Sequence, residues 1–396
     1  MKKIITSESV NIGHPDKTCD TLADAFLDAA LTEDKDSQMA VECAIKNDKL
    51  FIYGEATTKA NIDYETIAKE TLKDIGYTNE FTIVSEISKQ SPDINQAVAK
   101  KELMANDQGM VYGYASNETK EYMPLPIMAA HKLMKKYDEY RHTTDCYFAD
   151  AKSQVSVEYN SKNKPVAFKA ILVSVSHSKA LSHKQIVDDI KKNVVAPVLA
   201  EYPEIDSTKV KYIINPSGKF TIWGSFGDSG CVGRKIVVDT YGGVGRVGGG
   251  CFSSKNATKV DRSAAYYARY VAKNIVAHGL ADRCEIQASF AIGKPEPVSI
   301  YVDTFGTNKV TKREIDKFIA NNFCFRLQNI IDELDLLRPI YKQTASFGHF
   351  GRDEFPWEKI KDCKWCDLTI YSVFFILVVG GKLYVRFAYA FSLFWW

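Results

Sequence analysis

The chain has 396 residues, of which 45% are hydrophobic and 25% are charged. This composition is typical of a packed globular protein, and it excludes collagen-like, coiled-coil and intrinsically disordered chains. The 51 basic residues nearly balance the 49 acidic residues, so the net charge does not favour a general nucleic-acid-binding protein, and any anion-binding site must be local.

The clearest predicted helix begins directly after His14. Pro15 suits the first helical position and Asp16 the first turn, and apolar residues then recur at helical spacing. The segment Gly13–Lys17 places an imidazole, a carboxylate and an ammonium group at the positive end of a helix dipole, which favours an anion such as phosphate. Asp16 would oppose phosphate unless it holds a magnesium ion that bridges to it. An ordinary helix cap with a surface lysine explains the same residues equally well.

A strand hairpin followed by an amphipathic helix occurs three times along the chain. Such a unit cannot bury its apolar face alone. We therefore predict an α+β fold of three structurally similar domains, each a mixed β-sheet with helices, at 1–100, 112–231 and 233–361. Coincidence is the alternative, since a hairpin followed by a helix is common. The elements of the three copies are expected at 39–45, 49–53 and 64–75, at 154–159, 166–174 and 183–195, and at 284–292, 298–303 and 312–321.

Basic residues precede a glycine-rich loop between the second and third copies. Arg234 and Lys235 are predicted to open a strand over 236–240, and glycines crowd the loop 242–250. The loop contains a G-x-G-x-x-G string, but we reject a dinucleotide-binding fold because the glycines continue where its helix should begin, and the next clear helix waits until about Asp261. The bare backbone beside basic side chains favours a polyphosphate site. A flexible surface hairpin is the alternative.

Other charged residues lie near predicted strand ends, where each alone is weak evidence of a site because such charges are usually just solvated. They are Asp150, Lys152, Lys219 and Asp228. The segments 90–96 and 106–109 flank a stretch with little periodicity, which we interpret as a mobile lid or an exposed loop.

Several strings along the chain are long and unusual. They are 6–10, 13–17, 89–95, 107–109, 150–155, 233–243, 259–263, 268–287, 349–352 and 355–358. Taken together and in order, they resemble the S-adenosylmethionine synthetase (methionine adenosyltransferase) family over about residues 4–360. The resemblance implies a pseudo-threefold arrangement of the three domains. It also implies an enzyme in which the sulfur of L-methionine attacks the ribose C5′ of ATP, and the displaced triphosphate is hydrolysed to pyrophosphate and phosphate.

The resemblance further implies which residues form the site. Catalysis is expected of His14, Lys152, Arg234 and Lys235. ATP would be bound by His14, Asp150, Lys152, Lys219, Phe220, Asp228, Arg234, Lys235, Cys251 and Lys255. L-methionine would be bound by Glu55, Gln96, Asp228 and Lys259. The metal ligands would be Asp16 for Mg²⁺, Glu42 for K⁺ and Asp261 in the cation cluster.

The implied cofactors are Mg²⁺, with two divalent ions per site, and K⁺. The implied partners are ATP, L-methionine and further copies of the chain, in a homodimer or homotetramer with active sites between subunits, and no nucleic acid. The nine scattered cysteines indicate reduced thiols, and the N-terminal residues form no apolar signal region. We therefore expect a cytoplasmic protein without membrane contact.

Three residues beside the phosphate-binding lysines depart from the family pattern. Cys251 stands where a small alanine contacts the nucleotide, Ser254 where a glycine can supply a positive φ, and Asn256 where an aspartate is usual. No departure removes a group to which we assign chemistry, so we predict an active enzyme with altered substrate affinity. The alternatives are a catalytically impaired or regulatory homologue that binds a partner subunit, and an NAD-linked oxidoreductase that rests on the G-x-G-x-x-G string alone.

The segment 362–396 lies outside the family pattern. From Leu368 to Trp396, 10 of 29 residues are aromatic, and the apolar run is interrupted at 380–382. A membrane-spanning helix needs about 20 apolar residues, so a span here would be strained. We favour a frame-shifted or misassembled gene end. A membrane-surface attachment and a subunit-packing extension are the alternatives.

Overall fold

A computed structural model describes residues 3–89 and 103–363, together with the backbone of 372–379 and 382–389. Gln96 and the predicted lid segment 90–96 lie outside the described residues. The interpretation of that segment as a lid therefore stays a prediction.

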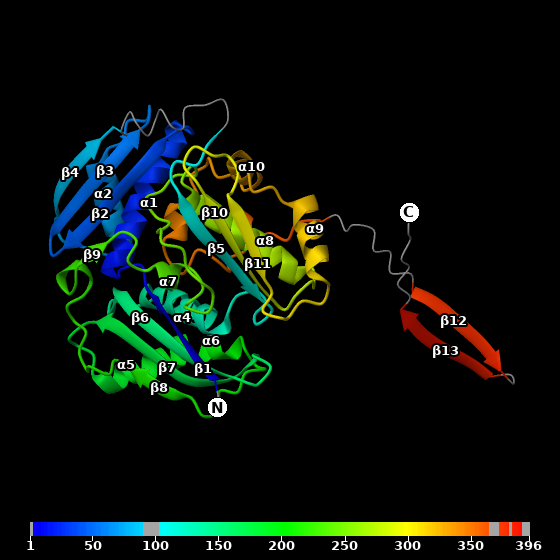
Figure 1. Cartoon of the computed structure of the whole chain (residues 1–396). Coiled ribbons are helices and arrows are strands. Elements are labelled where there is room, and N and C mark those ends of the chain that lie inside the picture. Colours follow the sequence, from blue (N-terminus) through cyan, green and yellow to red (C-terminus); the bar gives the residue numbers. More distant parts are fainter. Residues whose placement is uncertain (1–2, 90–102, 364–371, 380–381, 390–396) are drawn as a thin grey trace.

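The first lobe is a four-stranded sheet with two helices, at the upper left of Figure 1. The strands run in the order β4-β3-β2-β9, and β3 and β4 are parallel. Asp63 caps α2 by accepting a hydrogen bond from the Thr66 amide, and Gly76 ends the helix. The elements are α1 (Pro15–Glu33), β2 (Gln38–Lys46), β3 (Lys49–Thr57), α2 (Tyr64–Ile75), β4 (Thr82–Ser88) and β9 (Gly230–Cys231).

The second lobe is a sheet of order β1-β6-β7-β8 whose edge strand is the N-terminal strand of the chain. β1 pairs antiparallel with β6, so the chain begins in this lobe before it forms the first one. A capping box of Ser182 and Gln185 starts α5, and 191–195 continue it as a π-helical turn. The elements are β1 (Lys3–Val10), α4 (Leu125–Arg141), β6 (Tyr147–Tyr159), β7 (Pro165–His177), α5 (His183–Ile190), α6 (Ala196–Ala200) and β8 (Lys211–Ile214).

The third lobe is an antiparallel sheet of order β11-β10-β5. Its edge strand β5 lies in the sequence between β1 and α4 of the second lobe, so strand exchange ties the lobes together. The elements are β5 (Gly109–Ser116), α7 (Ile236–Asp239), α8 (Val260–Ala277), β10 (Arg283–Phe290), β11 (Ser299–Asp303), α9 (Lys312–Asn322) and α10 (Leu327–Glu333).

One long helix packs against each sheet. α1 packs on β2, α4 on β1 and β6, and α8 on β5 and β10, and these helices lie toward the middle of the molecule in Figure 1. The first and third lobes share one hydrophobic core, whereas the second has its own. The prediction of an α+β fold of three domains, each a sheet with helices, is confirmed.

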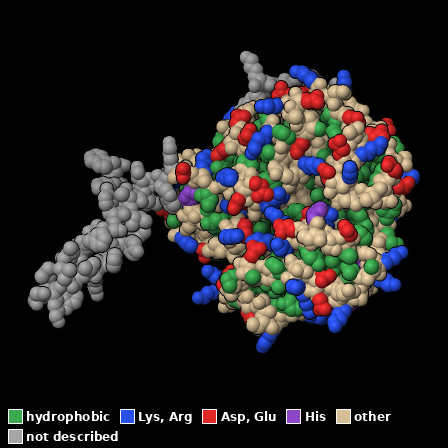
Figure 2. Space-filling model, turned by 180° about the vertical axis from the view of Figure 1, so that it is seen from behind, with side chains coloured by type: hydrophobic (Ala, Val, Ile, Leu, Met, Phe, Trp, Pro, Cys, Tyr) green, Lys and Arg blue, Asp and Glu red, His purple; other side chains and the backbone are tan. Residues whose placement is uncertain are grey.

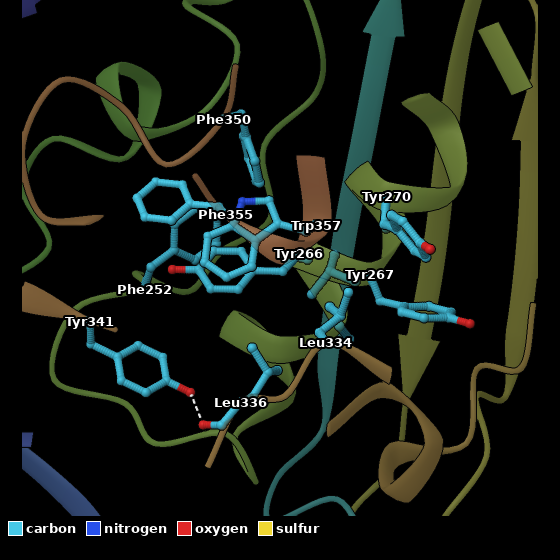
Figure 3. Close-up of a cluster of buried hydrophobic side chains, with 14 of the residues drawn as sticks. Phe252, Tyr266, Tyr267, Tyr270, Leu334, Leu336, Tyr341, Phe350, Phe355 and Trp357 are labelled. Atoms are coloured by element: carbon cyan, nitrogen blue, oxygen red, sulfur yellow. Dashed lines mark hydrogen bonds between the residues drawn. The ribbon is translucent and has the colours of Figure 1, made fainter. Parts of the chain in front are cut away.

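The segments 349–352 and 355–358, two of the strings that carry the family resemblance, contribute to an aromatic core that packs against α8. Figure 3 shows Trp357 stacked on Tyr266, with ring centroids 3.8 Å apart. The Trp357 indole donates a hydrogen bond to the His349 carbonyl at 2.8 Å. Both aromatic side chains are fully buried, so the segment 349–358 packs the third lobe.

The three hairpin-and-helix copies and α1 are confirmed as predicted, but the strand over 236–240 is wrong. The segment forms the helical turn α7 instead. Gly233 has a φ of +76°, which turns the chain after β9, and Asp239 of α7 pairs with the buried Lys17 of α1. The β-propensity of the valines is overridden because this contact with α1 requires a turn.

The described residues after the lobes form two strands. β12 (Ser372–Val379) and β13 (Lys382–Tyr389) pair antiparallel and lie apart from the lobes in Figure 1. None of the described helices combines the length and the apolar composition that a membrane span requires. The origin proposed for 362–396 stays a prediction.

Candidate functional site

The N-terminus of α1 carries a neutral imidazole. His14 is the N-cap, and its Nδ1 accepts a hydrogen bond from the Asp16 amide at 3.2 Å. Because a backbone amide donates to Nδ1, the neutral ring carries its proton on Nε2. Burial, reinforced by the ammonium groups of Lys235 and Lys152, lowers the pKa of His14 to about 3. The ring therefore offers one N–H donor at neutral pH.

Asp16 binds the segment that carries the two adjacent basic residues. Its Oδ2 lies 2.5 Å from Lys235 Nζ, its Oδ1 accepts a hydrogen bond from the Cys231 amide at 3.0 Å, and Arg234 Nε lies 3.5 Å away. Burial alone would raise the pKa of Asp16, but the hydrogen bonds from Lys235 and Cys231 outweigh it and lower that pKa. The structure thus brings four predicted site residues together, namely His14, Asp16, Arg234 and Lys235.

Asp150 and Lys152 of β6 lie beside this group. Asp150 Oδ2 accepts a hydrogen bond from the Gly224 amide at 3.0 Å, whereas its Oδ1 is buried without a hydrogen-bond partner among the described residues. Burial raises the pKa of Asp150 to about 6. The charges of Lys152 and Asp228 both influence the His14 ring, so these two exposed side chains also face the group.

A second group gathers at the start of α8. Lys255 Nζ lies 2.7 Å from Asp261 Oδ2. Gly250 passes so close that a Cβ there would lie 2.1 Å from that oxygen, so a larger residue would displace the Asp261 carboxylate. Burial and the neighbouring Lys255 lower the pKa of Lys259, against the opposing effect of nearby carboxylates that include Glu55 of β3.

Cys251 connects the two groups. A Cβ on Gly233 would lie 2.6 Å from the Cys251 Cβ, so the loop before α8 contacts the segment 231–235. Burial raises the pKa of the Cys251 thiol, and the nearby Glu42 carboxylate adds to the effect. Glu42, on β2, also accepts a hydrogen bond from Tyr53 Oη at 3.3 Å. The predicted residues of α1, β2, 231–235 and 250–261 therefore form one continuous site.

Two predicted nucleotide contacts remain apart from it. The Phe220 amide donates to His177 Nε2 at 3.1 Å, and its carbonyl accepts from the His177 amide at 2.9 Å. These bonds attach the loop to β7. Among the described residues, no hydrogen bond or ion pair joins Lys219 or Phe220 to the two groups.

The loop before α8 shows the surroundings of two departures from the family pattern. Ser254 has a φ of +77°, so the position does favour glycine, as predicted. At the second departure, the Asn256 side chain makes hydrogen bonds within the protein. It is buried, its Oδ1 accepts from the Met39 amide at 3.1 Å, and its Nδ2 donates to Gln38 and Thr258. An aspartate there would lose both donated bonds.

Replacing Ser254 with glycine is expected to raise the free energy of unfolding by about 1 kcal/mol. Relief of the left-handed φ exceeds the extra freedom of an unfolded glycine, and the Ser254 hydroxyl is buried without a partner among the described residues. Urea denaturation followed by circular dichroism measures the change. Ser253→Gly is the matched control, because that hydroxyl is also buried and unpartnered but its φ is not positive. The control should lose stability, and a gain in both variants would refute the strain argument.

Three buried charged residues lie below the site. The sequence analysis missed Asp20 and Asp239, and it was wrong about Lys17, which is neither a surface lysine nor available to an anion because it is buried in ion pairs. Lys17 of α1 lies between Asp20 of α1 and Asp239 of α7, and all three side chains are buried. A signal was present, because aspartates occur at every fourth position of α1, from Asp16 to Asp28, which places them on one face of the helix. Each of these aspartates accepts a hydrogen bond from at least one backbone amide of the chain after residue 230.

The carboxylates of the site suit a metal that is shared with a substrate. Among the described residues, no group of three or more histidine, cysteine, aspartate or glutamate side chains could hold a metal ion alone. Mg²⁺, however, is usually held by one or two carboxylates together with substrate phosphates. Asp16 and Asp261, each beside a lysine of the site, fit that mode of binding.

Three domain models of one protein family match almost the whole of the chain up to residue 359. Residues 2–101 match the S-adenosylmethionine synthetase N-terminal domain, 102–220 the central domain, and 222–359 the C-terminal domain. The S-adenosylmethionine synthase of Sorangium cellulosum (strain So ce56) is 47% identical over 369 residues, which cover 89% of this chain and 87% of that protein.

Proposed function

The chain belongs to the S-adenosylmethionine synthetase family and is a methionine adenosyltransferase, and from this premise we propose how its residues make S-adenosyl-L-methionine from L-methionine and ATP. A sulfur lone pair attacks C5′ of the ribose, the C5′–O bond breaks, and its electron pair leaves on triphosphate. A thioether has no proton to remove, so the site needs no general base. Its main task is to stabilise the charge that leaves on triphosphate, which is then hydrolysed to pyrophosphate and phosphate.

The observation that carries the proposal is the set of donors around the start of α1. The Nε2–H of His14, the ammonium of Lys235 and the half-exposed guanidinium of Arg234 surround a helix N-terminus. All three can donate to phosphate oxygens. We place the leaving triphosphate against them, with Lys152 and Lys255 at its further oxygens.

Other residues of the site would hold the remaining parts of the substrates. The buried, unpartnered Oδ1 of Asp150 and the exposed Asp228 would accept hydrogen bonds from the nucleotide. Lys219 and Phe220 would contact it from the loop after β8, and Cys251 from the loop before α8. L-methionine would contact Asp228 and the other proposed residues, namely Glu55, Gln96 and Lys259.

The metals would be held by the carboxylates next to the phosphate-facing lysines. Two Mg²⁺ ions would bind with the phosphates, with Asp16 as a ligand and Asp261 as an acidic member of the cation cluster, and Glu42 would contribute to a K⁺ site. Bound Mg²⁺ would supply neutralisation of the triphosphate charge. Lys235 and Lys255 already hold these carboxylates in place through ion pairs.

We also propose that active sites lie between subunits of a homodimer or homotetramer. The sheets turn one face away from their helices, and apolar side chains lie on it. In the first lobe Phe51 of β3 and Val84 of β4 are register neighbours and both are exposed. In the third lobe Met110 and Tyr301 are exposed in the same way. Charges of both signs are interspersed over the face shown in Figure 2.

A mass-spectrometric assay of the full chain with ATP, L-methionine, Mg²⁺ and K⁺ tests the proposal. We expect S-adenosylmethionine with phosphate and pyrophosphate, and a chain ending at Lys361 should be equally active because the proposed site lies within the three lobes. Omission of Mg²⁺ should abolish product, since triphosphate would then leave without charge neutralisation. A folded, oligomeric sample that makes no product would instead favour the regulatory homologue.

A further inference from the structure

Three buried charged residues with no role in the proposed reaction lie directly beneath Arg234 and Lys235. Lys17 is completely buried, and its Nζ lies 2.9 Å from Asp20 Oδ2 and also pairs with Asp239. We call Lys17, Asp20 and Asp239 the Lys17 clamp. Such groups are stable inside a protein only as partners, because an unpaired buried charge is strongly unfavourable.

The two carboxylates of the clamp hold both ends of the segment that carries Arg234 and Lys235. Asp20 Oδ1 accepts a hydrogen bond from the Gly233 amide at 2.9 Å, immediately before Arg234. Asp239 closes the helical turn that follows Lys235, and its carbonyl accepts a hydrogen bond from the His349 amide. Lys17 therefore connects two carboxylates, of which Asp20 holds the chain before Arg234 and Asp239 lies in the turn after Lys235.

We propose that the Lys17 clamp positions Arg234 and Lys235 for the triphosphate, acting through the backbone of 233–239 without touching the substrate. The proposal rests on the proposed function of this site. Lys17, Asp20 and Asp239 are therefore positioning residues and not catalytic ones.

The local backbone shows why positioning is needed. Gly233 lies at a φ of +76° and Lys235 at φ −126° and ψ 35°, so neither continues a helix or a strand. The register of β9 with β2 ends at Cys231, and one further backbone bond follows, from the Val232 amide to the Cys43 carbonyl. The direction of the two basic side chains therefore depends on the bonds that the segment makes with α1, and an error of about 1 Å in such a group can reduce a rate by about 10²-fold.

Asp20→Asn tests the clamp, and Asp28→Asn is a matched control. Asp20 uses both oxygens at once, one for Gly233 and one for Lys17. Asp28, on the same face of α1, also uses both, for the amides of Tyr341 and Lys342. An asparagine has one acceptor oxygen, so each variant must lose one bond. Only the loss at Asp20 frees the segment of Arg234 and Lys235.

The readouts separate positioning from stability. In the full chain with Mg²⁺, we expect Asp20→Asn to weaken the binding of tripolyphosphate in calorimetry at least tenfold. It should raise the KM for ATP in proportion, and the KM for methionine should stay within twofold. Asp28→Asn should leave all three quantities within twofold. If Asp20→Asn does not fold, Asp239→Leu serves instead, because it leaves Lys17 paired with Asp20, and at least a threefold effect in the same direction is expected.

Unchanged tripolyphosphate affinity in a folded Asp20→Asn or Asp239→Leu variant would overturn the clamp, and so would equal losses in the Asp28→Asn control. The proposed function fails separately. A wild-type chain that binds tripolyphosphate but makes no S-adenosylmethionine would overturn the proposed reaction and leave the clamp intact. A wild-type chain that binds no tripolyphosphate would overturn both.

Discussion

Replacing Lys235 with methionine should lower kcat/KM for S-adenosylmethionine formation roughly 10²–10³-fold, the effect typical of losing one donor to a developing negative charge. Lys235 is a partly buried cation beside the start of α1, with its ammonium 2.5 Å from Asp16. Methionine keeps the length of the side chain but removes the charge. The loss also leaves the Asp16 carboxylate without that partner, facing the triphosphate. Steady-state kinetics with each substrate varied in turn measures the effect.

The kinetic constants of Lys235→Met distinguish a role of Lys235 at the triphosphate from a general loss of folding. We expect kcat and the apparent affinity for ATP to fall while the KM for methionine stays unchanged. Lys69→Met is the control, because Lys69 is an exposed lysine on α2 that pairs only with Glu65 among the described residues, and it should behave as wild type. A loss of less than threefold in Lys235→Met would exclude Lys235 from transition-state stabilisation.

Replacing Asp24 with alanine should lower the free energy of unfolding by about 3–5 kcal/mol, because it leaves a buried guanidinium without its partner. Asp24 on α1 accepts two hydrogen bonds from Arg262 on α8, at 2.7 and 2.8 Å, and the Ser254 amide donates a third. Both side chains are completely buried. The pair joins the first lobe to the third. Urea denaturation followed by circular dichroism measures the change.

Two further variants identify the cause of that loss. Glu65→Ala removes an exposed pair with Lys69 on α2 and should leave the denaturation midpoint unchanged. The double variant Asp24→Leu with Arg262→Met removes both buried charges and should recover much of the stability lost in Asp24→Ala. A double variant that is less stable than Asp24→Ala would show that packing, and not the unpaired charge, dominates.

Local chemistry explains the elements that were predictable. The apolar stripe and Pro15 define α1, and the apolar alternation and turns define the three hairpins. The positive φ of Ser254 was also predictable, because a glycine is usual at that position in the family that the sequence resembles. Each of these features depends on residues close in the sequence or on the family pattern, so no tertiary contact is needed to infer it.

Contacts between distant segments explain what was not predictable. The valines of 236–240 have high β-propensity, yet Lys17, more than 200 positions away, pairs with Asp239 and draws the segment into a helical turn. The membership of β1 in the second sheet and of β5 in the third also depends on pairings across more than 100 residues.

Periodicity, helix caps and the family motifs are local properties, so the three-lobed α+β class and most residues of the proposed phosphate-binding site could be inferred from the amino-acid sequence. Only the three-dimensional contacts show that His14 is a neutral donor, that Asn256 belongs to a buried hydrogen-bond network, and that Lys17 pairs with Asp239. The reason is physical: the pKa of a group and the partner of a buried charge depend on what surrounds it in space, and α1 contacts residues from Cys231 to Lys342 that follow it by hundreds of positions.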